Sequence, residues 1–462
     1  MSLHVLPDPR LRRLADLVAR YDGRTPRYTS YPTAVQFSPA VDEATYRRWL
    51  AALPADEAIS LYLHIPFCAQ LCLYCGCNTR AVRRRGPISD YVTLLLREIT
   101  MLAEVLPARL KVRAIHLGGG SPNMLAPDDL DRLFAAIGEA FEIEGGCEVA
   151  AELDPSATSA EWIETAGRHG LTRASLGVQN LDPAVQAAVN RHETFDQVAL
   201  AVRRLRATGV RSINLDLMYG LPRQTTAGTL DTLNAILALE PERVALFGYA
   251  HVPWMKPHQA LIDEARLPSG LERLHQSESA AERLAEAGYV RIGLDHFARA
   301  DDDMALALSA GTLRRNFQGY TTDQAGTLLG VGASSIGRLP QGFAQNAKAE
   351  VAWRAAVEAG RLPVARGVAV SAEDRLIGEV IERLMCDLEV DLEVVRLHHQ
   401  ADPGVFDSAL LNLAPFIHDG LAVLGDDGVL RVIGDGRLLV RSVAAVFDAY
   451  LDSDGKRHAK AI

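Results

Sequence analysis

The sequence lacks several features that would assign it to a specialised class of protein. No apolar run approaches the 18 residues of a transmembrane helix, and the opening residues MSLHVLPDPR carry no basic-then-apolar signal pattern. The chain has 36 glycines and 22 prolines in 462 residues, which is ordinary usage and excludes collagen-like and low-complexity scaffolds. With 48% hydrophobic and 23% charged residues, we expect a folded, cytoplasmic protein without membrane insertion.

An excess of positive charge is also lacking. Lysine and arginine number 48 against 58 aspartates and glutamates, which gives a formal net charge of -10. A general nucleic-acid-binding protein is expected to be basic, so we expect no nucleic-acid partner. An anionic ligand must then be met by a local group of basic residues. No heptad pattern is present, and we expect a monomer.

Cysteine is scarce, but its distribution is uneven. The chain has six cysteines, four of which fall within ten positions as Cys68, Cys72, Cys75 and Cys77. The cytosol keeps thiols reduced, so this group indicates metal or redox chemistry and not a disulfide framework. The remaining two, Cys147 and Cys386, are isolated, and we expect them to pack as small apolar side chains.

From Ala58 onwards, short apolar runs alternate with amphipathic stretches of helical period. The runs predict buried strands and the stretches predict helices, so the pattern indicates repeated βαβ units around a parallel sheet, either open or closed into a barrel. The predicted strands cover 59–65, 113–120, 148–153, 173–179, 213–220, 243–250 and 290–297, and the predicted helices cover 89–105, 127–141, 195–208, 226–238 and 270–287.

Polar residues gather at the carboxyl ends of these predicted strands. In parallel α/β folds this edge of the sheet is where ligands bind, so we expect one composite site. The residues concerned are His64, the glycines 118–120, Glu152, Gln179, Asp216 and His251.

The two ends of the chain follow a different pattern. Prolines and the absence of periodicity in 24–33 predict an extended arm. The strand and helix alternation ends after Phe297, and we expect a glycine-rich passage and a linker at 360–367. A helical tail with one hairpin then resembles a winged-helix module, although it shows no basic face and fits a lid or docking piece better; its helices are expected at 371–388, 404–416 and 434–451, and its hairpin at 421–433.

The spacing of the cysteines suits an iron–sulfur cluster. Three thiolates spaced by three and then two residues can converge from one loop on a four-iron cluster and leave one iron open. Cys77 could instead close the shell as a fourth ligand. A zinc site using all four thiolates is a further alternative, but one residue between the last two cysteines would make it cramped.

A set of ordered motifs carries a family resemblance. The pattern CxxxCxxC followed by a strand ending in three glycines resembles the radical S-adenosylmethionine (SAM) superfamily. The fuller set closely resembles the oxygen-independent coproporphyrinogen III oxidases, strongly over about residues 20–350 and more loosely in the tail. Its motifs are PRYTSYPT, HIPFCxxxCxYCxC, GGGSPN, ELDP, SLGVQ, NRH, NLDLMYGLP, YAHVP, LDHFAR and RNFQGYTT.

The resemblance implies an α/β fold with a partial parallel (β/α) barrel. The barrel would span residues 56–365 and contain the cluster loop 68–77. A substrate-covering arm would occupy residues 1–55, and a smaller, mostly helical domain would occupy 366–462. Cys68, Cys72 and Cys75 would hold a [4Fe-4S] cluster whose open iron binds SAM, and Cys77 would not be a ligand.

The resemblance also implies which residues bind two SAM molecules. The residues alone leave structural alternatives to SAM binding. Glu152 and Asp216 could form salt bridges or cap helices, and Arg191 could be a solvated surface residue. Phe317 and Ile336 fit packing in the core equally well. The implied residues around the first SAM are Tyr62, Tyr74, Gly119, Gly120, Ser121, Glu152, Gln179, Arg191 and Asp216. Ala250, Phe317, Gln318 and Ile336 would line the second SAM, with Gly119 between the two.

The implied reaction is a radical decarboxylation. The reduced cluster would cleave SAM to methionine and a 5′-deoxyadenosyl radical, which takes hydrogen from a propionate side chain. Loss of carbon dioxide and an electron, done twice, would convert coproporphyrinogen III to protoporphyrinogen IX. Tyr62, Cys77 and Arg27 would take part in catalysis. A low-potential electron donor and an electron acceptor are required, and neither is identified.

The carboxylates of that substrate need basic partners. Arginine suits carboxylates well, which favours Arg24 and Arg27 in the arm over the run Arg80, Arg83, Arg84 and Arg85 after the cluster loop. Two other functions stay open: a related haem chaperone, whose relatives usually lack Cys77 and the arm motif, and a radical SAM methyltransferase. The roles of His64 and Cys77 are also open.

Overall fold

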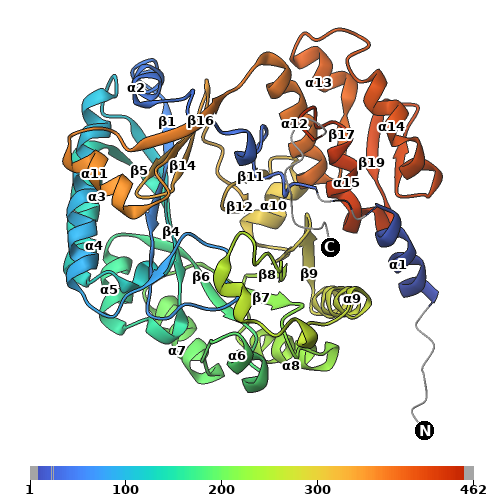
Figure 1. Ribbon diagram of the computed structural model, residues 1–462, viewed down its shortest axis with the longest axis horizontal. Helices are drawn as coiled ribbons and strands as arrows, with labels where there is room; N and C mark the ends of the chain where they lie inside the picture. The colour runs from blue at the N-terminus through green and yellow to red at the C-terminus, as the bar shows by residue number, and fades with distance from the viewer. Residues whose placement is uncertain (1–8, 22, 24, 452–462) are drawn as a thin grey trace.

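The computed structural model describes residues 9–21, 23 and 25–451, and it is built around one twelve-stranded sheet (Figure 1). The strand order is β16-β15-β14-β13-β1-β4-β5-β6-β7-β8-β10-β9. The strands are β1 (Ala58–Ile65), β4 (Lys111–Gly119), β5 (Glu142–Leu153), β6 (Leu171–Gln179), β7 (Ser212–Tyr219), β8 (Arg243–Gly248), β9 (Tyr289–Ile292), β10 (His296–Arg299), β13 (Thr327–Val331), β14 (Ile336–Leu339), β15 (Gly342–Asn346) and β16 (Val364–Ala369).

The first six strands of the barrel unit, β1 and β4 to β8, pair in parallel with their sequence neighbours. Helices connect them and cover the outer face of the curved sheet (Figure 1). This topology confirms the predicted α/β class with a partial parallel barrel. The connecting and covering helices are α3 (Gly86–Val105), α4 (Pro127–Ala140), α5 (Ala160–Arg168), α6 (Pro183–Ala188), α7 (Phe195–Ala207), α8 (Thr226–Leu237) and α9 (Gly270–Glu286).

The strand predicted at 290–297 is wrong in one respect, because the chain folds back there. β9 and β10 are antiparallel strands joined by a tight turn at Gly293, whose φ of 50° is left-handed. A Cβ at Gly293 would lie 2.0 Å from the Tyr320 hydroxyl, so only glycine fits the turn. Two neighbouring apolar runs separated by one glycine therefore looked like a single strand.

The sheet also extends beyond the predicted barrel on the other side of β1. β13 pairs in parallel with β1, and β14, β15 and β16 follow as antiparallel strands. The linker predicted at 360–367 is therefore wrong, since its second half, 364–367, belongs to the edge strand β16. An edge strand needs neither a continuous apolar run nor regular alternation, and β16 has only one buried residue.

A second hydrophobic core joins the C-terminal helices to part of the N-terminal segment. Leu17, Tyr28 and Tyr31 pack in this core, whereas helix α2 (Glu43–Ala51) packs on the barrel core. The remaining elements around the second core are α1 (Pro9–Tyr21), α12 (Ala372–Asp387), β17 (Glu389–Asp391), α13 (Leu392–His398), α14 (Asp407–His418), β18 (Ala422–Leu424), β19 (Val429–Val432) and α15 (Val440–Ala445).

The tail shows one clear departure from the predicted pattern. A 3-10 helix at Gly434–Leu439 precedes the short α15, so the single helix predicted at 434–451 is wrong. The reason is packing, because a Cβ at Gly436 would lie 2.0 Å from the Leu421 carbonyl oxygen. The helices and hairpin predicted before it are present within a few residues. No helix in the described part of the chain combines the length and apolarity needed to cross a membrane.

Candidate active site

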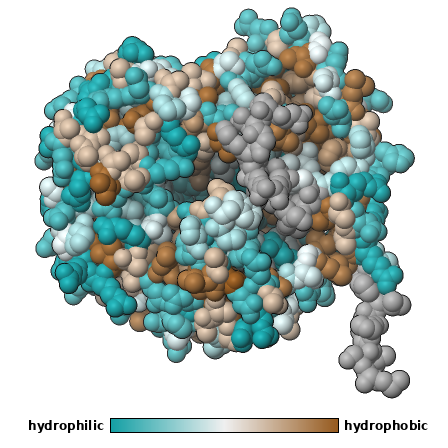
Figure 2. All heavy atoms as spheres, in the orientation of Figure 1, coloured by the Kyte–Doolittle hydropathy of each residue, from teal (hydrophilic) through white to brown (hydrophobic). Residues whose placement is uncertain are grey.

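A polar cavity of about 240 Å³ occupies the inside of the partial barrel. Side chains from the inward-facing positions of β1 and β4 to β8 line it, among them His116, Glu152, Ser175, Asn214 and Asp216. The hairpin of β11 (Arg314–Asn316) and β12 (Gly319–Thr321) lines it from the other side. The molecule is visibly hollowed near its centre (Figure 2). Of the polar residues that the sequence pattern assigned to strand ends, Glu152 and Asp216 meet in this cavity, whereas His64, the glycines 118–120, Gln179 and His251 do not line it.

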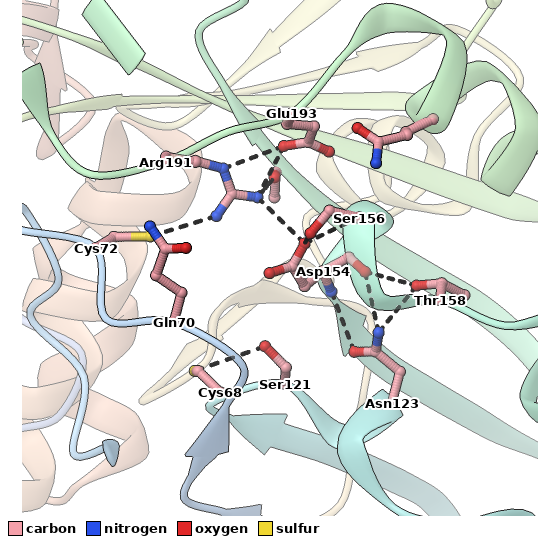
Figure 3. A network of polar contacts seen from close by, with 12 residues as sticks. Cys68, Gln70, Cys72, Ser121, Asn123, Asp154, Ser156, Thr158, Arg191 and Glu193 are labelled. Atoms are coloured by element: carbon pink, nitrogen blue, oxygen red, sulfur yellow. Dashed lines mark hydrogen bonds and ion pairs between the residues drawn. The ribbon is translucent and has the colours of Figure 1, made fainter. Parts of the chain in front are cut away.

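The cysteine loop lies between two short parallel strands, β2 (Phe67–Cys68) and β3 (Arg80–Ala81). Its first cysteine faces the end of β4 (Figure 3). The Ser121 hydroxyl donates to the Cys68 sulfur at 3.6 Å, and the Thr79 hydroxyl lies 3.1 Å from the same sulfur. Cys68 is thus held by polar contacts to both the glycine motif and the far end of its own loop.

The second cysteine is held by a buried ion pair. One Arg191 nitrogen, Nη1, lies 3.6 Å from the Cys72 sulfur and 3.4 Å from the Tyr74 hydroxyl. The same guanidinium binds the Glu193 carboxylate at 2.9 Å through Nη2, and the two side chains are only 11% and 1% exposed (Figure 3). The interpretation of Arg191 as a solvated surface residue is therefore wrong. Glu193 was not foreseen from the sequence.

A loop that follows β8 fixes the second half of the cysteine segment. Lys256 Nζ donates to the Cys77 carbonyl at 2.9 Å, His258 Nε2 to the Cys75 carbonyl at 2.8 Å, and Gln259 Nε2 to the Tyr74 carbonyl at 3.0 Å. No sequence motif indicated these three residues, because each side chain bonds a main-chain carbonyl of a segment about 180 positions earlier in the chain. The loop backbone is consequently preorganised from outside the barrel.

The arrangement of the thiols fits an iron–sulfur cluster better than a single ion. In the part of the chain that the structure describes, only Glu379, His398 and His399 bring three potential ligand atoms within 4.8 Å of one another. No three thiols of the loop lie within 4.8 Å of one another, so they do not form the compact set that a tetrahedral zinc site needs, although the Cys75 and Cys77 sulfurs are in hydrogen-bond contact. In a four-iron cluster each thiolate binds a different iron, which suits the wider spacing.

Cys77 and His64 occupy distinct places in this arrangement. The Cys77 thiol donates to the Cys75 sulfur; this hydrogen bond lowers the pKa of Cys75 to about 6 and raises that of Cys77. His64 Nε2 donates to the Asn78 carbonyl at 2.9 Å, which leaves Nδ1 to accept from the Tyr62 hydroxyl at 3.1 Å. Burial lowers the pKa of His64, so the ring is a neutral link between β1 and the cluster loop.

The backbone amides of the glycine motif are already engaged within the protein. The Gly119 amide donates to Glu152 at 3.0 Å and the Gly120 amide to the Ile65 carbonyl at 2.8 Å. Gly119 has a φ of 108°, and a Cβ there would lie 2.4 Å from the His64 ring. The glycines thus make room for His64 and the chain after β1, and their amides are already used.

The two carboxylates lie on the cavity in different environments. Glu152 bonds His116 Nε2 at 3.1 Å as well as the Gly119 amide, and these contacts outweigh burial and lower its pKa. Asp216 accepts from Ser175 and Asn214; burial, helped by the nearby charge of Glu152, raises its pKa to about 6. His116, for which no role was predicted from the sequence, is a direct hydrogen-bond partner of Glu152.

The other residues implied for the first SAM lie beside the cavity and do not line it. Tyr62 stacks on His116 with ring centroids 5.7 Å apart. Gln179 ends β6 with a left-handed φ of 63°, and its amide nitrogen lies beside Gly177, near Arg191. Ser121 contacts the Cys68 sulfur, and Tyr74 belongs to the cysteine loop and contacts Arg191. These contacts connect the residues to Glu152 or to the cysteine loop, and their binding roles stay predictions.

The four residues implied for a second SAM do not converge in the same way. Gln318 lines the barrel cavity, whereas Phe317 faces a second cavity on the opposite side of the β11–β12 hairpin. Neither Ala250 nor Ile336 lines either cavity. Phe317 packs edge-on against Phe343 at 5.9 Å, in line with the alternative interpretation as a packing residue.

The arginines proposed for substrate carboxylates are also dispersed. Arg24 lies outside the described residues, and Arg27 is exposed. Arg80 forms a bidentate pair with Glu350 at 2.7 and 3.1 Å, so its charge is already neutralised. The run Arg83, Arg84 and Arg85 is exposed, as expected of a solvated charge run.

Comparison with known proteins supplies independent evidence. Residues 62–236 match the radical SAM superfamily. Curated relatives named oxygen-independent coproporphyrinogen III oxidase are 49% identical in Bradyrhizobium diazoefficiens, over 97% of this chain and 100% of the relative, and 44% identical in Paracoccus denitrificans, over 96% and 97%. The solved coproporphyrinogen III oxidase of Escherichia coli, described as a radical SAM enzyme, superposes with a TM-score of 0.88 at 34% identity, covering 93% of this chain and 100% of that one.

Proposed function

The chain belongs to the oxygen-independent coproporphyrinogen III oxidase family of radical SAM enzymes, and from this we propose how its own residues divide the work. Its reaction is the oxidative decarboxylation of two propionate side chains of coproporphyrinogen III to vinyl groups, which gives protoporphyrinogen IX in haem biosynthesis. The cofactors are a [4Fe-4S] cluster and SAM.

Cys68, Cys72 and Cys75 bind the cluster in this proposal, and Cys77 stays outside its shell. When bound, the cluster and SAM supply the electron and the radical chemistry that removes hydrogen from the propionate. The wide spacing of the thiols and the contacts of Ser121 and Arg191 to two of them support this assignment. Arg191 lies beside the Cys72 sulfur, where its positive charge stabilises a thiolate.

The residues at the rim would hold SAM beside the cluster loop. Glu152 and Asp216 present acceptors to the ribose hydroxyls, and Tyr62 and Tyr74 flank the ligand. Gly119, Gly120, Ser121, Gln179 and Arg191 complete the rim. A second SAM beside Ala250, Phe317, Gln318 and Ile336 is a weaker part of the proposal, because these residues face different spaces.

The proposal extends to the organisation and partners of the chain. Residues 56–365 form the catalytic barrel, residues 1–55 help cover the substrate, with Arg27 near it, and residues 366–462 close the other side. A low-potential electron donor reduces the cluster, and an electron acceptor takes the electron released at each decarboxylation. We propose a cytoplasmic location, because six free thiols suit a reducing compartment. We also propose a monomer, since the sequence has no heptad pattern.

Anaerobic turnover tests the function. The reconstituted protein, given coproporphyrinogen III, SAM and a chemical reductant, should release 5′-deoxyadenosine and a product that mass spectrometry shows to be lighter by two carbon dioxide molecules and four hydrogen atoms, since each propionate loses carbon dioxide and two hydrogens to become a vinyl group. Omission of SAM is the control. Cleavage of SAM with no loss of substrate, or stable haem binding without decarboxylation, would contradict the proposal. The observation that carries it is the cysteine loop held at the rim of the cavity that contains Glu152 and Asp216.

A further inference from the structure

A second cavity, of about 300 Å³, lies on the opposite side of the β11–β12 hairpin from the barrel cavity. Four segments that are far apart in sequence form it: the arm at 28–31, the hairpin, the turn region around β13 and β14, and helix α12. It shares the wall residues Asn316, Thr321, Asp323 and Leu328 with the barrel cavity. We call it the arginine pocket, because Arg314, Arg315, Arg338 and Arg375 line it.

Three of these four guanidinium groups have no carboxylate partner. Arg314 is neutralised by Glu382 at 2.9 Å. Within the described part of the chain, no carboxylate oxygen lies within 4.0 Å of the guanidinium nitrogens of the other three. Arg338 donates only to the Ala325 and Gly326 carbonyls, and Arg375 only to the Pro340 carbonyl. The pocket therefore carries uncompensated positive charge.

Arg315 is the most informative of the three, because it is buried. Its residue is 8% exposed, and its Nε and Nη1 atoms have no hydrogen-bond partner in the described structure. Nη2 donates to the Arg27 carbonyl at 3.3 Å, and the guanidinium lies over the Tyr320 ring at 4.3 Å. A buried cation with unsatisfied donors is costly unless a ligand supplies acceptors.

The acidic residues on the pocket offset only part of this charge. Asp323, Asp374 and Glu382 line it beside the four arginines, so the lining keeps an excess of one positive charge (four minus three). Asp323 accepts from Ser60, and Asp374 accepts from Ser371 and the Tyr450 hydroxyl. Burial lowers the pKa of Arg338, and the nearby charges of Glu382 and Asp323 counter this only in part. The pocket is suited to an anion with at least two carboxylate groups.

The remaining walls define the rest of the ligand. Tyr28, Tyr31, Phe317 and Phe343 line the pocket with aromatic surface, which packs well on a flat apolar ring. We propose that the arginine pocket binds the carboxylates of the two propionates that coproporphyrinogen III retains, and so holds the macrocycle with its reacting edge toward the barrel cavity. This inference rests on the proposed function and names the substrate-binding part of the same site.

The geometry explains why the retained propionates are the ones held. The reacting side chains must lie on the rim side of the hairpin, where Glu152 and the cysteine loop are. The arginine pocket is on the other side, and the two cavities meet at the shared wall. A space of about 300 Å³ takes the carboxylate-bearing edge of a tetrapyrrole and not the whole ring.

Binding of a non-reacting porphyrin tests the pocket directly. The probe is coproporphyrin III, the oxidised and fluorescent form, added to the full protein, with its tetramethyl ester as the uncharged comparison. The variants are Arg315→Lys, Arg338→Gln and Arg375→Gln. Loss of one charge-assisted contact should weaken coproporphyrin binding about ten- to a hundredfold. Ester binding should not change.

A matched control and a stability measurement make the result specific. Arg366→Gln removes a half-buried arginine of the neighbouring strand that bonds Gln345 and does not line the pocket, so it should leave binding unchanged. Each variant is also melted, because Arg338 bonds two carbonyls that a glutamine cannot reach in the same way. Arg375 is exposed and makes one such bond, so its variant keeps the fold.

Turnover distinguishes failure of this inference from failure of the proposed function. If wild-type protein decarboxylates coproporphyrinogen III and folded Arg338→Gln and Arg375→Gln variants keep the same KM and the same porphyrin affinity, the pocket assignment is wrong and the function stands. If the wild-type protein binds coproporphyrin but never decarboxylates the reduced substrate, the function is wrong. A raised KM in both variants, with SAM cleavage in the absence of substrate unaffected, supports the pocket.

Discussion

The cluster rim, formed by residues 64–79, 118–121, 152, 177–193 and 216, and the arginine pocket differ in how far their charged groups are paired. At the rim the charged groups already have charged or polar partners before any ligand is present: Arg191 pairs with Glu193, although one oxygen of that carboxylate makes no hydrogen bond in the described structure, and His116 bonds Glu152. In the arginine pocket three guanidinium groups lack a carboxylate partner in the described structure, and Arg315 has two buried nitrogens without an acceptor. The rim is preorganised, whereas the pocket is incomplete without an anion.

This difference follows from what each region has to hold. A cluster and SAM react through precise geometry, and precise geometry needs supporting contacts that lock the loop, as those of Lys256 and His258 do. A substrate with several carboxylates needs charge that is not already neutralised. Changes at the rim should therefore abolish the chemistry or the fold, while changes in the pocket should mainly weaken binding. The following predictions test this contrast, from the largest effect to the smallest.

Cys68→Ser should have the largest effect. Serine keeps the size of the side chain but is a poor ligand for iron, so the cluster should be lost and activity should fall by at least about a thousandfold. Iron content, the absorption spectrum and release of 5′-deoxyadenosine measure this. Cys77→Ser is the matched comparison, because that residue contacts the Cys75 sulfur yet is proposed to lie outside the shell. Loss of the cluster in the Cys77 variant would make it the fourth ligand.

Arg191→Met tests whether the rim is a locked structure or only a binding surface. Removal of the guanidinium leaves Glu193 as a buried carboxylate with no counterion, which should cost about 3–5 kcal/mol of unfolding free energy. Arg431→Met removes an exposed partner of Asp427, whose ion pair is screened by solvent, so its unfolding free energy should stay close to that of the wild type. Denaturant unfolding of both variants gives the comparison. Equal small losses would mean that the Arg191 pair does not stabilise the rim.

The same contrast separates what the sequence could predict from what it could not. The cysteine loop, the parallel strands and the carboxylates at their ends were readable, because each is a short motif or a periodic pattern. His116 and His258 were missed because their partners are set by strand register or lie far away in the chain. Glu193 was missed although its partner Arg191 is only two residues away, because no motif signals that this pair is buried. The strand β16 and the hairpin turn at 293–295 were missed because edge strands and short turns leave weak patterns.

The arginine pocket could not be predicted for a further reason. Its residues come from four segments, and arginines such as Arg338 and Arg375 look like ordinary surface residues in the sequence. Only the fold shows that they face one cavity and that no carboxylate of the described chain pairs with them. The arginines considered from the sequence were adjacent to motifs; of the two favoured ones Arg27 is exposed, and Arg80 of the less favoured run is already paired with Glu350.

Two carboxylates at the rim offer the finest test, because their pKa values move in opposite directions. Burial, with the charge of Glu152 nearby, raises the pKa of Asp216 to about 6, while contacts to His116 and Gly119 lower that of Glu152. As pH falls from 7.5 to 5.5, Asp216 should take up a proton and lose its strength as a hydroxyl acceptor. SAM affinity should therefore fall by up to about tenfold with a midpoint near pH 6.

Variants assign that midpoint to one residue. Asp216→Asn cannot titrate, so equilibrium dialysis with labelled SAM should show weaker binding that no longer changes between pH 5.5 and 7.5. Glu152→Gln should also weaken binding but keep the step, because Glu152 is ionised across this range. If the step survives in Asp216→Asn, then the raised pKa does not govern SAM binding and the two carboxylates are equivalent acceptors. The rim would then not depend on the distinct protonation of its two carboxylates, and it would differ less from the arginine pocket in the precision of its contacts.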